Sequence, residues 1–400
     1  MTSAGVGLDG RVIGVARRWG ILAASTTAQA ASAVMVHGTA FLIPALHDRE
    51  GLNLAGAGLI AAAPTIGVMA TLVLWGLVTD RRGERLVLLS GLGLTALFGV
   101  LAVVSPSLPL LFVALVLAGA AAASTNAASG RVVVGWFPPH RRGLAMGIRQ
   151  MAQPVGVGIA AVTMAVTADA YGVHAALWVP SIASALATAL VLAVVIDPPR
   201  PARDVETAAN PYRQDGYLAR IHGVSALLVV PQFVVWTFAL VWLVQDRDWS
   251  PAAAGALVGV AQVAGALGRI AVGQLSDVVR SRMRPLRWVS IAAAATMALL
   301  GVTAGLGWAV AVPLVVLATL VTVADNGLAF TAVAERAGPF WSGRALGLQN
   351  TGQFAAASAV PPVAGLAIAA VGYPAAFAIA GLFPLLALAL VPVRHERALG

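Results

Sequence analysis

Long apolar segments alternate with short polar turns along almost the whole chain. About 20 apolar residues span the hydrocarbon core of a bilayer, and on that measure the sequence predicts twelve membrane-spanning helices. The first six are expected at approximately 18–44, 52–79, 85–104, 108–136, 142–168 and 173–197. The second six are expected at 220–245, 251–278, 286–305, 309–336, 342–369 and 373–392. The pattern therefore predicts an all-α membrane protein, in which Pro154 is a candidate helix kink.

The composition agrees with this pattern. Hydrophobic residues make up 59% of the 400-residue chain and charged residues only 10%, whereas a soluble domain carries about a quarter charged residues. A net charge of +9 would suggest a nucleic-acid partner for a soluble protein. Here the arginines cluster in short turns, so we expect no nucleic-acid partner. The absence of cysteine excludes disulfides and thiolate metal sites.

Arginine is distributed unequally between the two sets of turns, and the arginine-rich side of a membrane protein is normally cytoplasmic. The opposite turns hold only Arg49 and Arg247. The termini and the turns after even-numbered helices hold Arg11, Arg17, Arg18, Arg81, Arg82, Arg85, Arg141, Arg142, Arg200, Arg203, Arg213, Arg220, Arg280, Arg282, Arg284, Arg287, Arg336, Arg344, Arg394 and Arg397. We therefore expect both termini in the cytoplasm, and a first helix that is an anchor rather than a removable signal peptide.

The two halves of the chain repeat one another. Asn126 and Asn326 are 200 residues apart, and so are Gln153 and Gln353. The sequence GLAMG at 143–147 returns as GRALG at the same spacing. The longest polar stretch lies between the copies. The predicted organisation is an N-terminal six-helix bundle at 1–197, a cytoplasmic linker at 198–219 and a C-terminal six-helix bundle at 220–400.

The most polar turn carries a motif, GLVTDRRGER, at Gly76–Arg85, and a related sequence, GQLSDVVRSR, begins 197 residues later at Gly273. The pattern Gly-x-x-x-Asp-Arg-x-Gly-x-Arg resembles the turn between helices 2 and 3 of the major facilitator superfamily. This resemblance implies secondary transport by alternating access, with two pseudo-symmetric bundles and a substrate site near the midplane.

The same motif predicts a cytoplasmic gate. We expect Arg131 to pair with Asp80, which can also cap the helix that begins near residue 342, because free backbone N–H groups there favour a negative charge. In the second half, Glu335 is expected to pair with Arg280 or Arg344. The predicted gate residues are Gly76, Asp80, Arg81, Gly83, Arg85, Arg131, Asp277 and Arg280.

Ionisable groups inside the membrane are candidate functional residues, because each costs about 2.5–3.5 kcal/mol to insert and needs a partner or a water-filled cavity. Arg269 and Arg149 lie at similar depths in opposite halves, and two guanidiniums can bind a carboxylate through bidentate hydrogen bonds. Alternatively, each pairs with a carboxylate or with helix carbonyls. The run GALGRIAVGQLSD around Arg269 also resembles helix 8 of oxalate/formate exchangers and monocarboxylate transporters, where an arginine binds the anion.

Other polar residues within the predicted helices complete the candidate site. Asp325 is the only acid near mid-membrane, and it is expected to carry a coupling proton or, alternatively, to be a permanent partner of Arg269 or Arg149. Secondary substrate contacts are expected at Asn126, Asn326, Gln153, Gln353, His37 and Asn350. The alternative for the amides and the histidine is simple hydrogen bonding between helices.

The predicted function is transport of a small organic anion, a monocarboxylate, across the bacterial inner membrane with a proton or by exchange. The alternatives are proton-driven efflux of drugs or other bulky neutral or acidic compounds, and a non-transporting sensor. The Arg-x-x-Gln-Gly pattern of drug exporters is absent, since Leu115 and Ala118 stand at its arginine and glutamine positions.

No motif for an enzyme is present, neither a phosphate-binding loop nor a nucleophile elbow. We therefore expect no catalytic residue, cofactor or metal site. The expected partners are a small-molecule substrate, a proton or counter-substrate, and the lipid bilayer, and the protein is expected to be a monomer.

Overall fold

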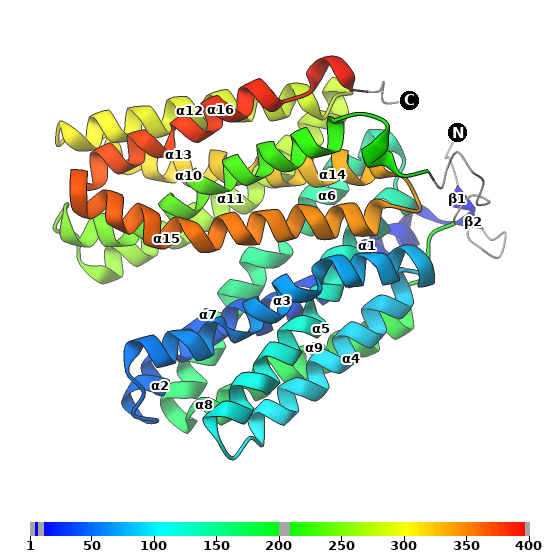
Figure 1. The fold of residues 1–400 in the computed structure, drawn as a ribbon, viewed down its shortest axis with the longest axis horizontal. Helices are drawn as coiled ribbons and strands as arrows, with labels where there is room; N and C mark the ends of the chain where they lie inside the picture. The colour runs from blue at the N-terminus through cyan, green and yellow to red at the C-terminus, as the bar shows by residue number, and fades with distance from the viewer. Residues whose placement is uncertain (1–4, 7–11, 200–208, 397–400) are drawn as a thin grey trace. The chain divides into compact units, whose positions relative to one another are not determined.

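The computed structural model describes residues 5–6, 12–199 and 209–396. Arg11, Arg200, Arg203 and Arg397 of the arginine distribution lie outside these described residues, as does much of the predicted linker. Apart from a short antiparallel pair, β1 (Gly5–Val6) and β2 (Val12–Ile13), the described chain is mostly helical (Figure 1).

The helices follow the order of the predicted segments. The first half contains α1 (Val15–Gly38), α2 (Ile43–Asp48), α3 (Leu54–Arg82), α4 (Glu84–Val103), α5 (Leu108–Trp136), α6 (Pro139–Gln150), α7 (Ala152–Tyr171), α8 (Val173–Ala176) and α9 (Trp178–Val194). The second half contains α10 (Tyr217–Gln245), α11 (Pro251–Val279), α12 (Met283–Gly305), α13 (Ala311–Val323), α14 (Asp325–Ala337), α15 (Ser342–Ala380) and α16 (Leu382–Leu390). Short 3-10 turns occur at Thr39–Leu42, Pro211–Arg213 and Val393–His395.

Within the described residues, eleven helical segments are long and apolar enough to cross a membrane. The last of them, Ser342–His395, is 54 residues long, more than twice what a bilayer requires. Its backbone leaves the helical conformation at Gly372, where φ is 79° and ψ is 168°, a conformation that glycine adopts without steric cost. The chain reverses direction there and returns through α16 (Figure 1).

Two predicted helices are interrupted. The segment predicted at 142–168 breaks at Met151, between α6 and α7. Proline has no N–H group, so Pro154 cannot donate to the carbonyl of Gln150 one turn earlier, which accounts for the break. The segment predicted at 309–336 breaks at Ala324, and the Asn326 side chain there donates to the carbonyl of Val323 at 3.3 Å.

The described chain forms two compact units that do not simply follow chain order. The first unit contains residues up to Phe137, Met151–Ala209 and Ala337–Leu348. The second contains Pro138–Gln150, Asn210–Arg336 and the chain from Gln349 onward. Helix α6 thus belongs to the second unit, where it packs on α11, and the start of α15 belongs to the first.

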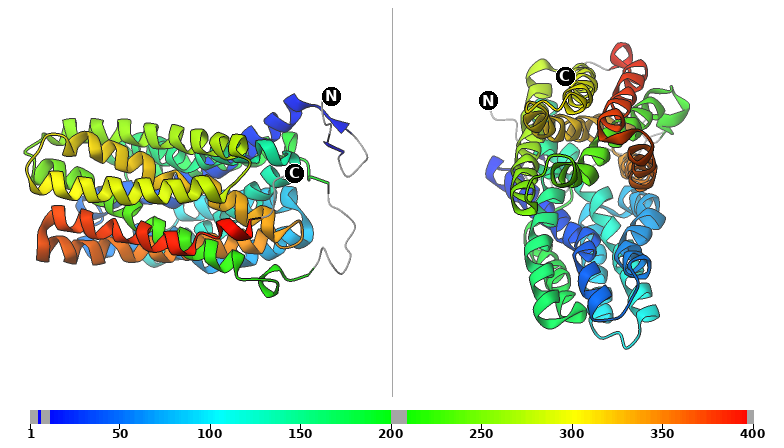
Figure 2. Two further views of the ribbon diagram at one scale, coloured as in Figure 1. Left: turned by 90° about the horizontal axis from the view of Figure 1, so that it is seen from above. Right: turned by 90° about the vertical axis from the view of Figure 1, so that its left-hand side faces the viewer.

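Each unit has its own apolar core. In the first unit, α5 packs against α3 and α4, and the core includes Met35, Leu115 and Met164. In the second unit, α12 and α16 lie side by side (Figure 2), and Trp242 packs edge-on against Phe377 in the core. These contacts fix the helices that carry the polar residues described next.

Candidate functional site

Asp80 caps the N-terminus of α15 inside the first unit. Its carboxylate accepts hydrogen bonds from the backbone N–H groups of Gly343 and Arg344 at 2.8 and 3.0 Å, and from Arg344 Nε at 2.9 Å. A side chain on Gly76 would overlap the backbone of Gly343, so glycine permits the close approach. The cap expected from the sequence is therefore present.

Arg131 binds Asp80 from the other side, as the sequence predicts, with an Nη1–Oδ1 distance of 3.5 Å. It also forms an ion pair with Glu84, which is fully buried, and donates to the carbonyl of Pro339. Glu84 was not predicted as a partner of Arg131. Its place as the first residue of α4, directly after Gly83, was the available signal.

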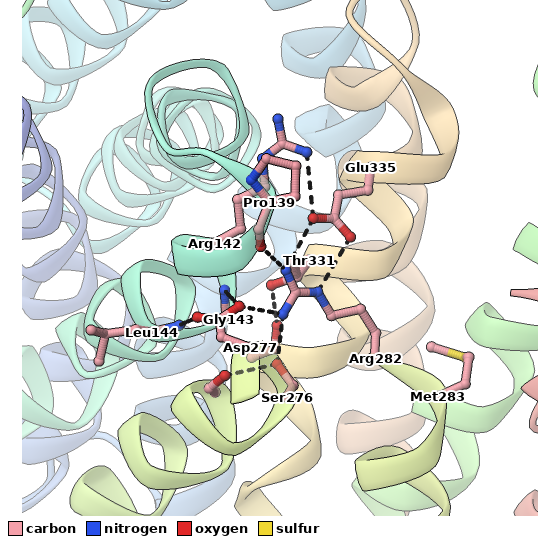
Figure 3. Close-up of polar contacts among 12 residues, drawn as sticks. Pro139, Arg142, Gly143, Leu144, Ser276, Asp277, Arg282, Met283, Thr331 and Glu335 are labelled. Atoms are coloured by element: carbon pink, nitrogen blue, oxygen red, sulfur yellow. Dashed lines mark hydrogen bonds and ion pairs between the residues drawn. The ribbon is translucent and has the colours of Figure 1, made fainter. Parts of the chain in front are cut away.

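The second unit contains a matching arrangement (Figure 3). Asp277 accepts hydrogen bonds from the backbone N–H groups of Gly143 and Leu144 at 2.9 and 2.8 Å. Gly273 approaches Gly143 so closely that a side chain on either would overlap the backbone of the other. Asp277 thus binds backbone N–H groups in the N-terminal part of α6, at its fifth and sixth residues, as Asp80 binds those of the second and third residues of α15.

Arg282 supplies the cation of this second cluster (Figure 3). Its guanidinium lies 2.5 Å from Asp277 Oδ1 and 3.2 Å from Glu335 Oε1. Burial lowers the pKa of Arg282, but the two carboxylates raise it further, so its pKa lies above the ordinary value and the group stays charged. Figure 3 also shows Arg142 facing Glu335, at 3.4 Å.

The predicted partners of Glu335 were therefore wrong. Glu335 contacts Arg282 and Arg142, whereas Arg344 contacts Asp80. Arg280 takes the left-handed conformation that ends α11, with φ 53° and ψ 39°. The chain turns there, and Arg282, two residues later, returns to Asp277.

The remaining gate residues surround the turn at Gly83, where φ is 103°. Arg81 is exposed. Arg85 does not join Asp80; its Nη2 donates to the carbonyl of Leu192 at 2.9 Å, and its backbone N–H donates to Asp197 at 2.7 Å.

Asp197 therefore caps the N-terminus of α4. In the other unit, a second acid caps the N-terminus of α12. Glu396 accepts a hydrogen bond from the backbone N–H of Met283, at the start of α12, at 3.1 Å. Neither acid was identified from the sequence. Both follow the last long helix of their half of the chain, which is the only signal that could have pointed to them.

Arg149 and Arg269 meet at the end of α6. Arg269 Nη1 donates to the carbonyl oxygen of Gln150 at 2.6 Å, and Arg149 Nη1 donates to the side-chain oxygen of the same residue at 2.8 Å. Their exposed fractions are only 1% for Arg149 and 3% for Arg269. The Arg149 guanidinium lies 5.6 Å from the centre of the Phe330 ring. Both arginines belong to the second unit, because α6 does.

Asp325 lies nearby in the same unit, as the first residue of α14, and is 1% exposed. Its charge acts on Arg269. In the described part of the chain, however, no carboxylate lies within ion-pair distance of Arg269, and no other side chain donates a hydrogen bond to Asp325. A direct, permanent ion pair of these two groups is therefore not formed.

The two repeated asparagines connect helices. Asn126 accepts a hydrogen bond from Gln29 at 2.9 Å. Asn326 donates to Gln232 at 3.2 Å and accepts from Gln353 at 2.9 Å. Each asparagine is thus bonded to a glutamine of the first long helix of its own unit, which is the simple interhelical arrangement.

The other predicted contacts are divided between the two units. Gln153 Nε2 lies 3.4 Å from His37 Nε2 in the first unit. Asn350 is buried in the second unit. The neighbouring Gln349 bonds to Ser225 and His222. The structure therefore brings Arg269, Arg149 and Asp325 into one region and leaves His37 and Gln153 in the other unit.

The chain is similar in sequence to a family of transporters. A family model described as Major Facilitator Superfamily matches residues 23–361. An uncharacterized MFS-type transporter of Mycobacterium tuberculosis is 47% identical over 384 residues, 95% of this chain and 86% of that protein. A glycerol-3-phosphate transporter of Bacillus subtilis is 26% identical over 231 residues, 53% of this chain and 52% of that protein.

Solved structures share the fold at low sequence identity. The transporter FucP in the outward conformation has a TM-score of 0.74 at 16% identity, over 94% of this chain and 99% of that one. The human organic anion transporter MFSD10 has a TM-score of 0.72 at 17% identity, with the same coverage, 94% and 99%. At these identities the likeness concerns the fold alone.

Proposed function

Since the chain belongs to the major facilitator superfamily, whose members are transporters rather than enzymes, we propose that it carries a small organic anion across the membrane by alternating access. A proton accompanies the anion, or a second substrate is exchanged for it. We further propose twelve membrane crossings, with Gly372 separating the last two, and both termini in the cytoplasm of a bacterial cell. The protein acts as a monomer in the inner membrane.

The observation that carries this proposal is the pair of buried guanidiniums at Gln150. A buried charge is costly unless it is paired, and among the described residues Arg269 donates only to a carbonyl oxygen of α6. An incoming carboxylate would add charge compensation and could accept two parallel hydrogen bonds from a guanidinium. A lipophilic cation would meet two like charges instead.

Asp325 provides the coupling in this proposal. While its carboxyl group is ionised, its negative charge partly compensates Arg269 and competes with the substrate. Protonation removes that competition, so the anion binds best when Asp325 carries a proton, and deprotonation favours its release. One proton and one monoanion together move no net charge, so transport should follow the pH gradient and not the membrane potential.

The relatives support an anionic substrate at the level of their names. The B. subtilis relative is named for glycerol 3-phosphate, an organic anion, although it matches only 53% of this chain. The structural neighbour MFSD10 is named an organic anion transporter, although FucP, with the same fold, is a fucose:proton symporter. The buried arginines support the anionic class.

A thermal-stability screen of the purified protein tests the substrate class. Carboxylates and lipophilic cations are compared at acid and neutral pH, because a ligand that binds the folded state raises its melting temperature. We expect carboxylates to stabilise the wild type, most strongly at acid pH, and to lose their effect in Arg269→Ala. The matched control is Arg287→Ala, which removes an exposed guanidinium. Stabilisation by cations or bulky neutral compounds alone would favour efflux instead.

Transport into proteoliposomes tests the coupling. We expect uptake of a stabilising carboxylate to follow an imposed pH gradient in the wild type and to be insensitive to membrane potential. In Asp325→Asn the pH dependence should disappear, while exchange of internal for external anion continues. Uptake driven strongly by potential, or unchanged by Arg269→Ala, would refute this mechanism.

A further inference from the structure

We propose that the side chain of Gln150 holds the position beside Arg149 that the carboxylate of the substrate takes when it binds. This proposal rests on the proposed anion transport and names the residue that controls access to the anion site. Gln150 was not among the substrate contacts predicted from the sequence. It is, however, the one residue that accepts hydrogen bonds from both Arg149 and Arg269 within the described chain.

The backbone of Gln150 is available for Arg269 because of a proline. In an uninterrupted helix, the carbonyl of Gln150 would accept a hydrogen bond from the residue four positions later, which is Pro154. Proline has no N–H, so the carbonyl at the end of α6 is left free and accepts from Arg269 Nη1 at 2.6 Å. The C-terminal end of a helix also favours a positive charge.

The side chain of Gln150 is a weaker hydrogen-bond acceptor for Arg149 than a carboxylate would be. Its oxygen accepts from Arg149 Nη1 at 2.8 Å but brings no negative charge, and hydrogen bonds between two ionised groups are the stronger kind. The amide therefore gives the guanidinium a neutral acceptor that an anion can replace. Gln150 is also only partly buried, whereas Arg149 is 1% exposed. A ligand reaching Arg149 from the side of Gln150 meets this oxygen first.

The pair of an arginine and a glutamine at 149–150 has no counterpart in the second copy of the internal repeat. The positions 200 residues after Arg149 and Gln150 are Gln349 and Asn350. Gln349 bonds to Ser225 and His222 of α10 instead of to a second amide beside a cation. An arginine followed by glutamine at the end of a broken helix is therefore a specific feature of the first copy.

Three variants separate this role from a structural one. Gln150→Glu places a permanent carboxylate beside Arg149, Gln150→Met removes the oxygen while keeping a similar volume, and Gln274→Glu is a charge control on an exposed part of α11. Melting temperatures are measured without ligand and with increasing lactate or glycerol 3-phosphate, at acid and neutral pH. Among the described residues of the second unit, Arg149 contacts the side chain of Gln150, Arg269 contacts its backbone carbonyl, and the charge of Asp325 acts on Arg269.

We expect Gln150→Glu to melt above the wild type without ligand, and its affinity for both anions to fall by at least about ten-fold at neutral pH. Acid pH should partly restore that affinity, as the introduced carboxyl is protonated. Gln150→Met should melt below the wild type without ligand and bind both anions more tightly. Gln274→Glu should behave as the wild type.

Two results would overturn the inference while leaving anion transport intact. Either Gln150→Glu binds lactate as the wild type does, or Gln150→Met loses affinity as severely as Gln150→Glu, which would mean that the amide only orients Arg149. If neither anion stabilises the wild type, the proposed function fails, and this inference fails with it.

Discussion

The contact between Gly273 and Gly143 should tolerate no side chain. A methyl group on Gly273 would overlap the backbone carbonyl of Gly143, and a backbone carbonyl cannot move aside as a flexible side chain can. Helix α6 would have to shift, and the two hydrogen bonds from its N-terminus to Asp277 would lengthen. Overpacking of this kind costs about 1–3 kcal/mol, and a weakened hydrogen bond to a charged group costs about 1.5–3 kcal/mol if it is lost entirely.

The matched control is Gly259→Ala in the same helix, where an added methyl group meets open space. There the change removes only the flexibility of glycine and should be neutral or stabilise by about 0.5–1 kcal/mol. We expect Gly273→Ala to be destabilised by about 2 kcal/mol net. Thermal unfolding of the purified variants in detergent measures the difference. Equal melting temperatures for the two variants would refute the argument.

Three further variants test individual caps and ion pairs by the same measurement. Arg131→Met removes the buried guanidinium that pairs with the carboxylates of Glu84 and Asp80, and should destabilise by about 3–5 kcal/mol; an unchanged melting temperature would contradict the pairing. Asp197→Ala removes the acceptor for the Arg85 backbone N–H and should cost about 1 kcal/mol, clearly less than Arg131→Met. Asn53→Ala removes the cap of α3 at a similar cost, and a larger loss would indicate a further contact.

The fold could be predicted from the sequence because the length of each apolar segment indicates a membrane-spanning helix. Helix α5, for example, begins at Leu108 and ends at Trp136, as predicted. The interruptions within two of the predicted helices were harder to predict from the sequence. Pro154 was predicted as a kink, but the interruption at Ala324 lies beside an Asn326 side chain that donates to a backbone carbonyl, and a polar contact of that kind leaves no apolar pattern.

The candidate site was predictable residue by residue but only partly in its pairings. Asp80 follows from the motif, and its contacts with Arg131 and the start of α15 were predicted. Burial of Arg149 and Arg269 follows from their position in apolar segments, but their partners did not follow. Glu335 binds Arg282 and not Arg280, because Arg280 itself forms the left-handed turn at the end of α11 and the chain after it brings Arg282 back toward Glu335. Gln150 was overlooked because its importance comes from α11 packing against α6.

The cap on Asp80 also sets a condition on biosynthesis. Its backbone partner in Arg344 lies 264 residues later in the chain, so at ordinary rates of synthesis it emerges about 13–50 s afterwards. Until then, Asp80 and Arg131 lack the helix end that completes their cluster, although all the long helices of the first unit have already been made. A ribosome that stalls before residue 343 therefore leaves an N-terminal half that contains its own apolar core. In that half, Asp80 lacks the backbone N–H groups of Gly343 and Arg344 as hydrogen-bond donors.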